Sequence, residues 1–289
     1  MINKSYKLNN GVKIPAIGLG TWQLDNTTVV DAIRNATSLG YRLIDTAKSY
    51  GNEHGVGIGI KECGISRSEL FLTTKIPSEC KSYNEAVTCI DEALTTLDED
   101  YIDLMIIHSP EPWSDFRNEN HYFSENIEVY NALEDAYMEG KLRSIGLSNF
   151  LEVDVDNILD NCSIKPMVNQ ILCHIGSASL ELINYCNSHD ILIEAYSPIA
   201  HGVVFGNRDI QRIADKYDVS VAALCMKYII ELGCVPIPKS GNIKHMQDNL
   251  DVNFSISNSD MDYLKSLVID DYGELSIHNI FGGKNLPRK

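Results

Sequence analysis

The amino-acid sequence predicts an α/β fold, a (β/α)8 TIM barrel with an N-terminal β-hairpin. Eight short apolar segments are distributed along the 289 residues. Longer segments between them place apolar residues three and four positions apart, as amphipathic helices do. Several short segments are apolar at nearly every position, which is typical of parallel strands buried on both faces. Eight strand–helix units of this kind favour a barrel.

The eight predicted strands are short, and polar residues lie at, near or just beyond their ends. They are residues 16–20, 41–45, 70–75, 102–108, 143–148, 167–171, 191–196 and 234–238. Helical periodicity is clearest in three of the segments between and after them. These are residues 84–98, 125–139 and 178–189, and Gly140 is the expected stop of the second helix.

The two ends of the chain carry local signals as well. Residues 6–14 place Asn10-Gly11 between two short alternating runs, a strong signal for a hairpin before the first barrel strand. Near the other end, Ser257 to Asp260 has the pattern of a helix-capping box. Gly55, Gly57 and Gly59 fall within a helical segment, where we interpret them as sites of close helix packing. No dinucleotide-binding Gly-x-Gly-x-x-Gly follows an early strand, which argues against a doubly wound sheet.

Composition narrows the function classes. The formal net charge is −16, which argues against nucleic acid or an anionic membrane as a partner. No stretch approaches the roughly 20 apolar residues of a membrane helix, and residues 1–15 lack the apolar core of a signal peptide. The eight cysteines show neither Cys-x-x-Cys nor zinc-site spacing. We therefore expect one domain, residues 1–289, in the cytoplasm, with buried thiols and no metal.

Four residues with complementary chemistry lie at or just beyond the ends of predicted strands. Asp45, Lys75 and His108 close three strands, and Tyr50 follows the first of these strands in the next loop. The carboxyl ends of parallel barrel strands share one rim, so the four side chains should converge. An ammonium beside a phenol favours the phenolate, and a carboxylate keeps a buried ammonium charged. The pattern fits an acid catalyst, although a structural Asp–Lys ion pair would give it too.

Several blocks of sequence, in order, resemble the aldo-keto reductase family over about residues 5 to 270. The blocks are Gly18–Trp22, Leu43–Ala47, Tyr50–Glu53, Gly146–Phe150, Val168–Gln170, Ala195–Pro198 and Ile237–Ser240. The resemblance implies a (β/α)8 barrel that uses NAD(P)H to reduce aldehydes and ketones reversibly, without a metal. It implies that Tyr50 is the proton donor, that Lys75 lowers its pKa, that Asp45 holds Lys75, and that His108 orients the carbonyl.

The same resemblance implies a cofactor site along the rim. Its expected residues are Thr21, Ser148, Asn149, Gln170, Tyr196, Ser197, Lys239, Ser240, Lys244, His245 and Asn249. Tyr196 would stack on the nicotinamide, while Ser148, Asn149 and Gln170 would bind its carboxamide. The family often has arginine where this chain has His245. We therefore expect NADPH as the cofactor, with NADH possible, because imidazole lacks the bidentate phosphate contact of a guanidinium.

The expected substrate pocket contains Trp22, Ser109 and Trp113. The family often has tryptophan directly after the catalytic histidine, so Ser109 predicts a roomier or more polar pocket. Trp113, in the long loop 111–124, is a candidate replacement for that wall. His174 and His201 follow strand ends and are candidates to face the same mouth.

These observations lead to one functional prediction and one alternative. The prediction is an NAD(P)H-dependent aldo-keto reductase, active as a monomer on a small-molecule carbonyl substrate. The alternative is a regulatory or redox-sensing barrel that binds the cofactor without significant turnover. The intact set of Asp45, Tyr50, Lys75 and His108 favours the enzyme.

Overall fold

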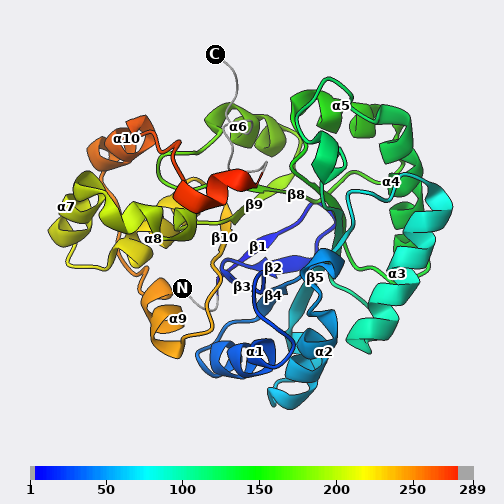
Figure 1. The fold of residues 1–289 in the computed structure, drawn as a ribbon, viewed down its shortest axis with the longest axis horizontal. Helices are drawn as coiled ribbons and strands as arrows, with labels where there is room; N and C mark the ends of the chain where they lie inside the picture. The colour runs from blue at the N-terminus through cyan, green and yellow to red at the C-terminus, as the bar shows by residue number, and fades with distance from the viewer. Residues whose placement is uncertain (1–3, 279–289) are drawn as a thin grey trace.

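The computed structural model describes residues 4–278, and these form the predicted barrel of parallel strands enclosed by helices (Figure 1). The barrel strands are β3 (Gly18–Gly20), β4 (Leu43–Asp45), β5 (Phe71–Ile76), β6 (Leu104–Ile107), β7 (Ile145–Ser148), β8 (Val168–Leu172), β9 (Leu192–Tyr196) and β10 (Val235–Ile237). Each pairs in parallel with the next strand along the chain. All eight predicted strands are confirmed, with ends that differ by one or two residues.

The barrel closes between its first and last strands. Gly20 forms a parallel bridge with Lys239, and its amide donates to the Pro238 carbonyl at 3.0 Å. A β-carbon on Gly20 would lie 2.9 Å from the Ile237 carbonyl oxygen, closer than real contacts allow. Glycine at this position therefore permits the close approach that completes the ring.

The helices surround the barrel and cover the outer faces of the strands (Figure 1). They are α1 (Thr28–Ser38), α2 (Glu53–Glu62), α3 (Tyr83–Leu97), α4 (Phe123–Met138), α5 (Glu152–Asn161), α6 (Leu180–Ser188), α7 (Arg208–Lys216), α8 (Val221–Glu231), α9 (Ile243–Asn249) and α10 (Asn258–Ser266). The glycines of α2 do allow close packing: a β-carbon on Gly57 would lie 2.2 Å from the Leu97 carbonyl oxygen. Gly140 follows α4 with a φ of 80°, as expected of a helix stop.

The capping box predicted at the start of α10 is only half formed. The Ser257 hydroxyl accepts from the Asp260 amide, as predicted, but the Ser257 amide donates to the Tyr217 hydroxyl at 2.8 Å. The Asp260 carboxylate instead accepts from Lys216, Tyr217 and the Ser257 hydroxyl. A partner distant in sequence has replaced the local one, which the short motif could not reveal.

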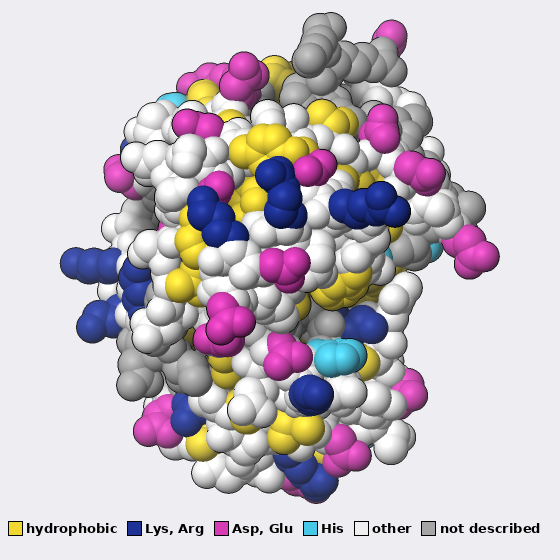
Figure 2. Space-filling view, turned by 90° about the vertical axis from the view of Figure 1, so that its left-hand side faces the viewer, with side chains coloured by type: hydrophobic (Ala, Val, Ile, Leu, Met, Phe, Trp, Pro, Cys, Tyr) yellow, Lys and Arg dark blue, Asp and Glu magenta, His cyan; other side chains and the backbone are white. Residues whose placement is uncertain are grey.

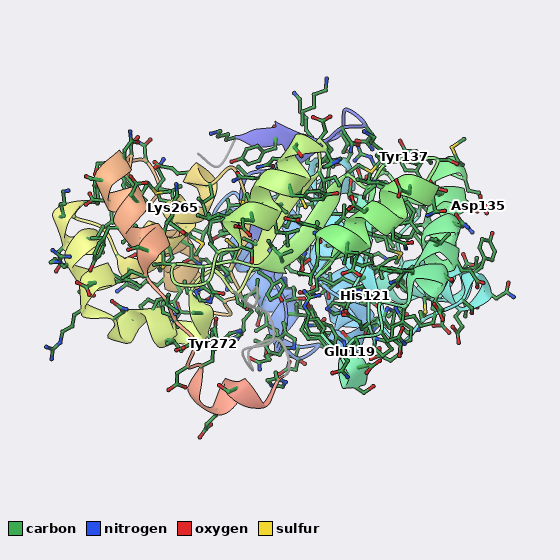
Figure 3. The ribbon with its side chains drawn as sticks, turned by 90° about the horizontal axis from the view of Figure 1, so that it is seen from above. Glu119, His121, Asp135, Tyr137, Lys265 and Tyr272 are labelled. Atoms are coloured by element: carbon green, nitrogen blue, oxygen red, sulfur yellow. The ribbon has the colours of Figure 1, made fainter. Side chains whose placement is uncertain are left out.

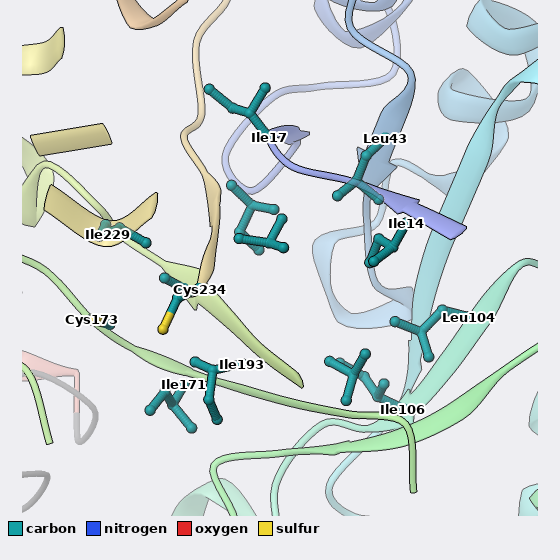
Figure 4. Packing of buried hydrophobic residues seen from close by; sticks show 14 of the residues in the cluster. Ile14, Ile17, Leu43, Leu104, Ile106, Ile171, Cys173, Ile193, Ile229 and Cys234 are labelled. Atoms are coloured by element: carbon teal, nitrogen blue, oxygen red, sulfur yellow. The ribbon is translucent and has the colours of Figure 1, made fainter. Parts of the chain in front are cut away.

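The N-terminal hairpin and Tyr272 lie at opposite ends of the barrel. The predicted hairpin, β1 (Ser5–Lys7) with β2 (Lys13–Pro15), covers one end. Its fully buried Ile14 lies near Leu43 and Leu104 in the core (Figure 4). Tyr272 lies at the other end, opposite the blue N-terminal strands (Figure 3).

Among residues 4–278, no helix has the length and apolarity needed to cross a membrane.

Candidate active site

The carboxyl ends of the strands surround a cavity of about 760 Å³. Its walls contain both predicted and unpredicted residues. They are Gly20, Trp22, Gln23, Asp45, Ser49, Tyr50, His108, Trp113, Ser148, Asn149, Gln170, Tyr196, Ser197, Pro198, Ile199, His201, Gly202, Phe205, Ile237, Lys239 and His278. The polar rim predicted from the strand ends therefore surrounds a cavity, and most of the strand ends contribute polar groups to its wall.

A buried ion pair lies at the inner wall of this cavity. The Lys75 ammonium donates to both carboxylate oxygens of Asp45, each at 2.8 Å, and to the Thr46 carbonyl at 2.8 Å. These three acceptors use all three donors of the ammonium. Burial lowers the pKa of Lys75, but the Asp45 carboxylate and the Tyr50 phenol together more than offset this effect, so the net pKa is raised. Lys75 is therefore charged at neutral pH even though its side chain is completely buried.

Tyr50 lies beside this ion pair at the end of the short helix η1 (Lys48–Tyr50). The Lys75 Nζ is 5.0 Å from the centre of its ring. Removal from solvent raises the pKa of Tyr50, and the Lys75 charge opposes that rise. The sequence prediction that Lys75 lowers the pKa is thus correct for the contribution of Lys75, but burial outweighs it here. Tyr50 is protonated at neutral pH, the state that a proton donor requires.

His108 faces Tyr50 across the cavity, with ring centres 5.8 Å apart. Burial, together with the Lys75 charge, lowers the pKa of His108 well below its ordinary value, so the imidazole is neutral. Its Nδ1 lies 3.4 Å from the Ser49 hydroxyl. A hydroxyl that donates to Nδ1 leaves the proton on Nε2, which can then donate to a substrate carbonyl. Sequence reasoning missed Ser49, although its position next to Tyr50 was a usable signal.

A second wall of the cavity is a connected set of polar side chains. The Asn149 amide donates to the His108 carbonyl at 3.0 Å and to the Ser148 hydroxyl at 3.1 Å. The Tyr196 hydroxyl donates to Asn149 Oδ1 at 2.7 Å. Gln170 donates to Asp45 Oδ2 at 2.8 Å, which links this wall to the ion pair. The predicted carboxamide-binding residues and the predicted stacking tyrosine therefore lie together.

Glu194 is a buried acid that sequence reasoning missed. It lies within β9, fully buried, and accepts from Gln170 Nε2 at 3.0 Å. Its other oxygen is buried and has no hydrogen-bond partner in the described part of the chain. Burial raises the pKa of Glu194 to about 8, and the Asp45 charge adds to this effect. A glutamate inside an otherwise apolar strand was the available sequence signal.

The raised pKa gives a prediction for Glu194→Gln. Folding raises the pKa from its unfolded value to about 8, so the contribution of this group to stability is full below about pH 4 and is lost as pH rises to about 8. At pH 8 we expect the free energy of unfolding of the glutamine variant to exceed that of wild type by on the order of a few kcal/mol. At pH 5 the two free energies of unfolding should be similar. Urea unfolding at both pH values measures this difference. Equal differences at the two pH values would contradict a buried neutral acid.

Of the four predicted phosphate residues, Lys239 alone is part of the cavity wall formed by residues 4–278. Lys239 is exposed and lines it, whereas Ser240 is buried and bonds to the Asn242 backbone. Lys244 and His245 are exposed in the first turn of α9.

Two other predicted cofactor residues lie below the surface. Asn249 is buried and hydrogen-bonded to Tyr41, and Thr21 is buried and donates to the Asp45 carbonyl at 2.9 Å. Ser197 lines the cavity and contacts His201 at 2.9 Å.

The mouth of the cavity is aromatic. Trp22 makes edge contacts with His201 at 5.3 Å and with His278 at 5.8 Å between ring centres. Trp113, on the short helix η3 (Trp113–Asp115), makes an edge contact with His108 at 5.1 Å. Trp22 and Trp113 thus lie where the sequence placed them.

Ser109 requires a correction. It is completely buried, and the cavity wall formed by residues 4–278 does not include it. Its hydroxyl accepts a hydrogen bond from the Glu111 amide at 3.4 Å, so the side chain stabilises the turn at the start of the long loop. Trp113 provides the aromatic wall in its place. His174 is also buried away from the cavity: its Nε2 contacts the Tyr272 hydroxyl at 2.8 Å. His201 does face the mouth, as expected.

Arg117 is a further residue that sequence reasoning missed. Its side chain is only 10% exposed, and its guanidinium donates to the Asn149 carbonyl at 2.8 Å. Asn149 has a φ of 63°, an uncommon conformation for a side-chain-bearing residue. Through this hydrogen bond, Arg117 joins the long loop after β6 to the backbone of Asn149, a predicted cofactor residue. No local pattern in the sequence indicates a contact across 32 residues.

Comparison with known proteins agrees with this geometry. Residues 16–269 match the Aldo/keto reductase family. Glyoxal reductase of Bacillus subtilis is 37% identical over 272 residues, 93% of this chain and 95% of that protein. A methylglyoxal reductase of Escherichia coli O157:H7 is 35% identical, over 85% of this chain and 86% of that protein. The crystal structure of an aldo-keto reductase of Bombyx mori in complex with NADP has a TM-score of 0.85 and 31% identity, covering 95% of this chain and 96% of that one.

A parallel barrel with an acid, a charged lysine, a phenol and a neutral imidazole at its mouth defines a class of barrel oxidoreductases. The chain belongs to the aldo/keto reductase family. It is an NAD(P)H-dependent oxidoreductase that reduces carbonyl groups.

Proposed function

We propose that this enzyme reduces small aldehydes and α-dicarbonyl compounds, with NADPH as the preferred cofactor and Tyr50 as the proton donor. The observation that carries the proposal is the position of Tyr50, protonated and partly buried, beside the charged Lys75 at the inner wall of the cavity. The names of the glyoxal and methylglyoxal reductases support the substrate class.

The residues fit a nicotinamide dinucleotide. An aromatic ring (Tyr196), hydrogen-bonding side chains (Ser148, Asn149 and Gln170) and a cation (Lys239) line one continuous cavity of about 760 Å³. When bound there, the dinucleotide would supply a hydride to the carbonyl carbon.

The protein's own residues would then control the carbonyl oxygen. His108 donates a hydrogen bond to it through Nε2 and orients the substrate. Tyr50 gives its proton to the oxygen as negative charge develops there. The Lys75 ammonium stabilises the resulting phenolate, and Asp45 keeps that ammonium charged.

We propose that the enzyme acts as a single-domain monomer on a small molecule, in the cytoplasm. The face shown in Figure 2 carries basic and acidic side chains intermixed rather than one basic surface, which supports a small-molecule partner over nucleic acid. The test is cofactor oxidation with glyoxal, methylglyoxal, simple aldehydes and keto-sugars, using NADPH and NADH in turn. Saturable turnover of the dicarbonyls is expected. Tight NADPH binding without turnover of any carbonyl would instead favour the regulatory alternative.

Trp113 should set the size of accepted substrates. Removing the indole in Trp113→Ala opens the wall beside His108, so a bulky aromatic α-ketoaldehyde should gain relative to glyoxal by roughly tenfold in kcat/KM. Kinetics with glyoxal and with an aromatic α-ketoaldehyde measure the ratio. An unchanged ratio would place the substrate elsewhere in the cavity.

His245 should limit the preference for NADPH. In His245→Arg, a guanidinium can contact the 2′-phosphate with two hydrogen bonds, so NADPH should bind roughly tenfold tighter, while NADH should change little. Dissociation constants from fluorescence titration measure both. His54→Arg, at an exposed position in α2, is a matched control for the added charge. If both variants gain equally, the phosphate does not lie near residue 245.

A further inference from the structure

Two cysteines outside the proposed active site lie in direct contact. Cys80 is in the loop between β5 and α3, and Cys89 is on the second turn of α3. Their Sγ atoms are 3.0 Å apart. Both are free thiols, and each residue keeps 8% of its surface exposed. The pair is therefore shielded but still within reach of a small reagent.

The charges around this pair favour a thiolate on Cys89. Lys48 Nζ lies 3.7 Å from Cys89 Sγ and also pairs with Glu92. A hydrogen bond from the Cys80 thiol, supported by the Lys48 charge, lowers the pKa of Cys89 to about 7, although burial and Glu92 oppose this effect. The same hydrogen bond, with burial and Glu85, raises the pKa of Cys80. Cys89 is thus the thiol that ionises more readily, while Cys80 retains its proton.

Other cysteines of the chain have different surroundings. Burial raises the pKa of Cys173 and of Cys225 to about 12, and that of Cys186 to about 11. Cys63 and Cys162 are more exposed, and their thiols donate to the carbonyls of their own helices. These two provide internal controls, since they are more accessible than Cys80 and Cys89 but have ordinary local contacts.

We propose that Cys80 and Cys89 form a peroxide-reactive dithiol, in which Cys89 attacks the peroxide and Cys80 resolves the product to an intramolecular disulfide. The Cys89 thiolate attacks one oxygen of hydrogen peroxide, so that an S–O bond forms, the O–O bond breaks and the released hydroxide takes a proton to become water. The Cys80 sulfur then attacks the Cys89 sulfur. An S–S bond forms, the S–O bond breaks, and the departing hydroxide takes the Cys80 proton. Two thiols and one peroxide give one disulfide and two waters.

The position of the pair connects it to two parts of the proposed active site. Lys48, which contacts Cys89, begins η1, and this helix ends at Tyr50. The residue before Cys80, Glu79, accepts from the Trp113 amide at 3.4 Å. The disulfide would therefore join a segment that contacts η1 to a segment that contacts the Trp113 loop.

Peptide mapping tests the proposal directly. Trypsin cuts after Lys75, Lys81 and Arg117, so Cys80 and Cys89 fall in separate peptides, 76–81 and 82–117. The reduced protein is treated with a small excess of hydrogen peroxide at pH 7, blocked with iodoacetamide, digested and analysed by mass spectrometry. We expect a linked 76–81/82–117 species that lacks two hydrogens, while Cys63 and Cys162 are recovered alkylated. Recovery of Cys80 and Cys89 alkylated under conditions that oxidise Cys63 would overturn the proposal.

Three variants assign the roles, and circular dichroism of each reduced variant verifies its fold. In Cys80→Ser the sulfenic acid on Cys89 cannot be resolved, so dimedone should label peptide 82–117. In Cys89→Ser the reaction at Cys80 should be lost. Lys48→Met should slow disulfide formation at pH 7 roughly tenfold because the thiolate fraction falls, whereas Lys61→Met, at another exposed ion-paired lysine, should not. Equal rates in both lysine variants, or dimedone labelling at Cys80 instead, would contradict the assigned order of attack.

Discussion

Replacing Tyr50 with phenylalanine should lower the turnover number by about 10²–10⁴-fold, the usual contribution of a general acid. The substitution removes the hydroxyl alone and leaves the ring beside His108 and the Lys75–Asp45 pair. Binding of NADPH should stay within a few-fold of wild type, because the aromatic ring is kept and the hydrogen bond between Tyr196 and Asn149, in the wall that we expect to hold the nicotinamide, does not involve the Tyr50 hydroxyl.

Steady-state reduction of methylglyoxal and fluorescence titration of NADPH separate the two effects. Tyr83→Phe removes an exposed hydroxyl that donates to Asp135 on the barrel's outer surface, and it serves as the matched control. Wild-type turnover in Tyr50→Phe would remove Tyr50 from the mechanism. A loss of NADPH binding comparable to the loss of turnover would indicate that the residue supports the cofactor rather than the proton transfer.

Replacing Lys75 with methionine should inactivate the enzyme and destabilise the fold. The variant leaves the Asp45 carboxylate buried without its cation, a loss of roughly 3–5 kcal/mol of unfolding free energy when one partner of a buried pair is removed. The remaining hydrogen bond from Gln170 to Asp45 offsets only part of this loss. Urea unfolding and turnover at pH 7 measure the two effects.

The pH dependence gives a second test of the same pair. The pKa of Lys75 is raised on folding, so its contribution to stability is present at neutral pH and is lost as pH rises above the ordinary lysine value of about 10.4. The methionine variant should lack this alkaline loss. Asp45→Asn should be less destabilising but should still change the pH profile of turnover, since Lys75 loses its counter-charge. Wild-type stability and pH profile in both variants would contradict the assigned roles.

Much of the fold follows from patterns that act over short distances. The apolar strands could be located because both of their faces are buried, and their polar ends could be assigned to one rim because barrel strands are parallel. The convergence of Asp45, Lys75 and His108 follows from these two facts, whereas Tyr50 lies in the loop after β4 and is not placed by them. The direction of a side chain in a loop depends on tertiary contacts instead. Ser109 follows His108 directly, yet its side chain points into the protein interior.

The interactions missed from the sequence join residues that are far apart in the chain. Arg117 reaches the Asn149 backbone, and Gln170 joins Glu194 to Asp45 by two hydrogen bonds. The composition of each segment gives no indication of its partner. The opposing effects on Tyr50 were likewise not predictable, because the balance between burial and the Lys75 charge depends on how much solvent reaches the phenol.

The bond from Arg117 to the Asn149 carbonyl has a consequence for how substrate range can change in this lineage. The loop after β6 carries Trp113, so we expect substitutions there to alter which substrates the mouth admits. The same loop holds the main chain of a residue expected to seat the nicotinamide. Exchange of the whole loop with a homologous enzyme would therefore transfer selectivity cleanly only if the donor loop preserves this arginine anchor. Substitutions at other positions of the loop leave the Arg117–Asn149 hydrogen bond in place, so these positions are the better targets for directed evolution.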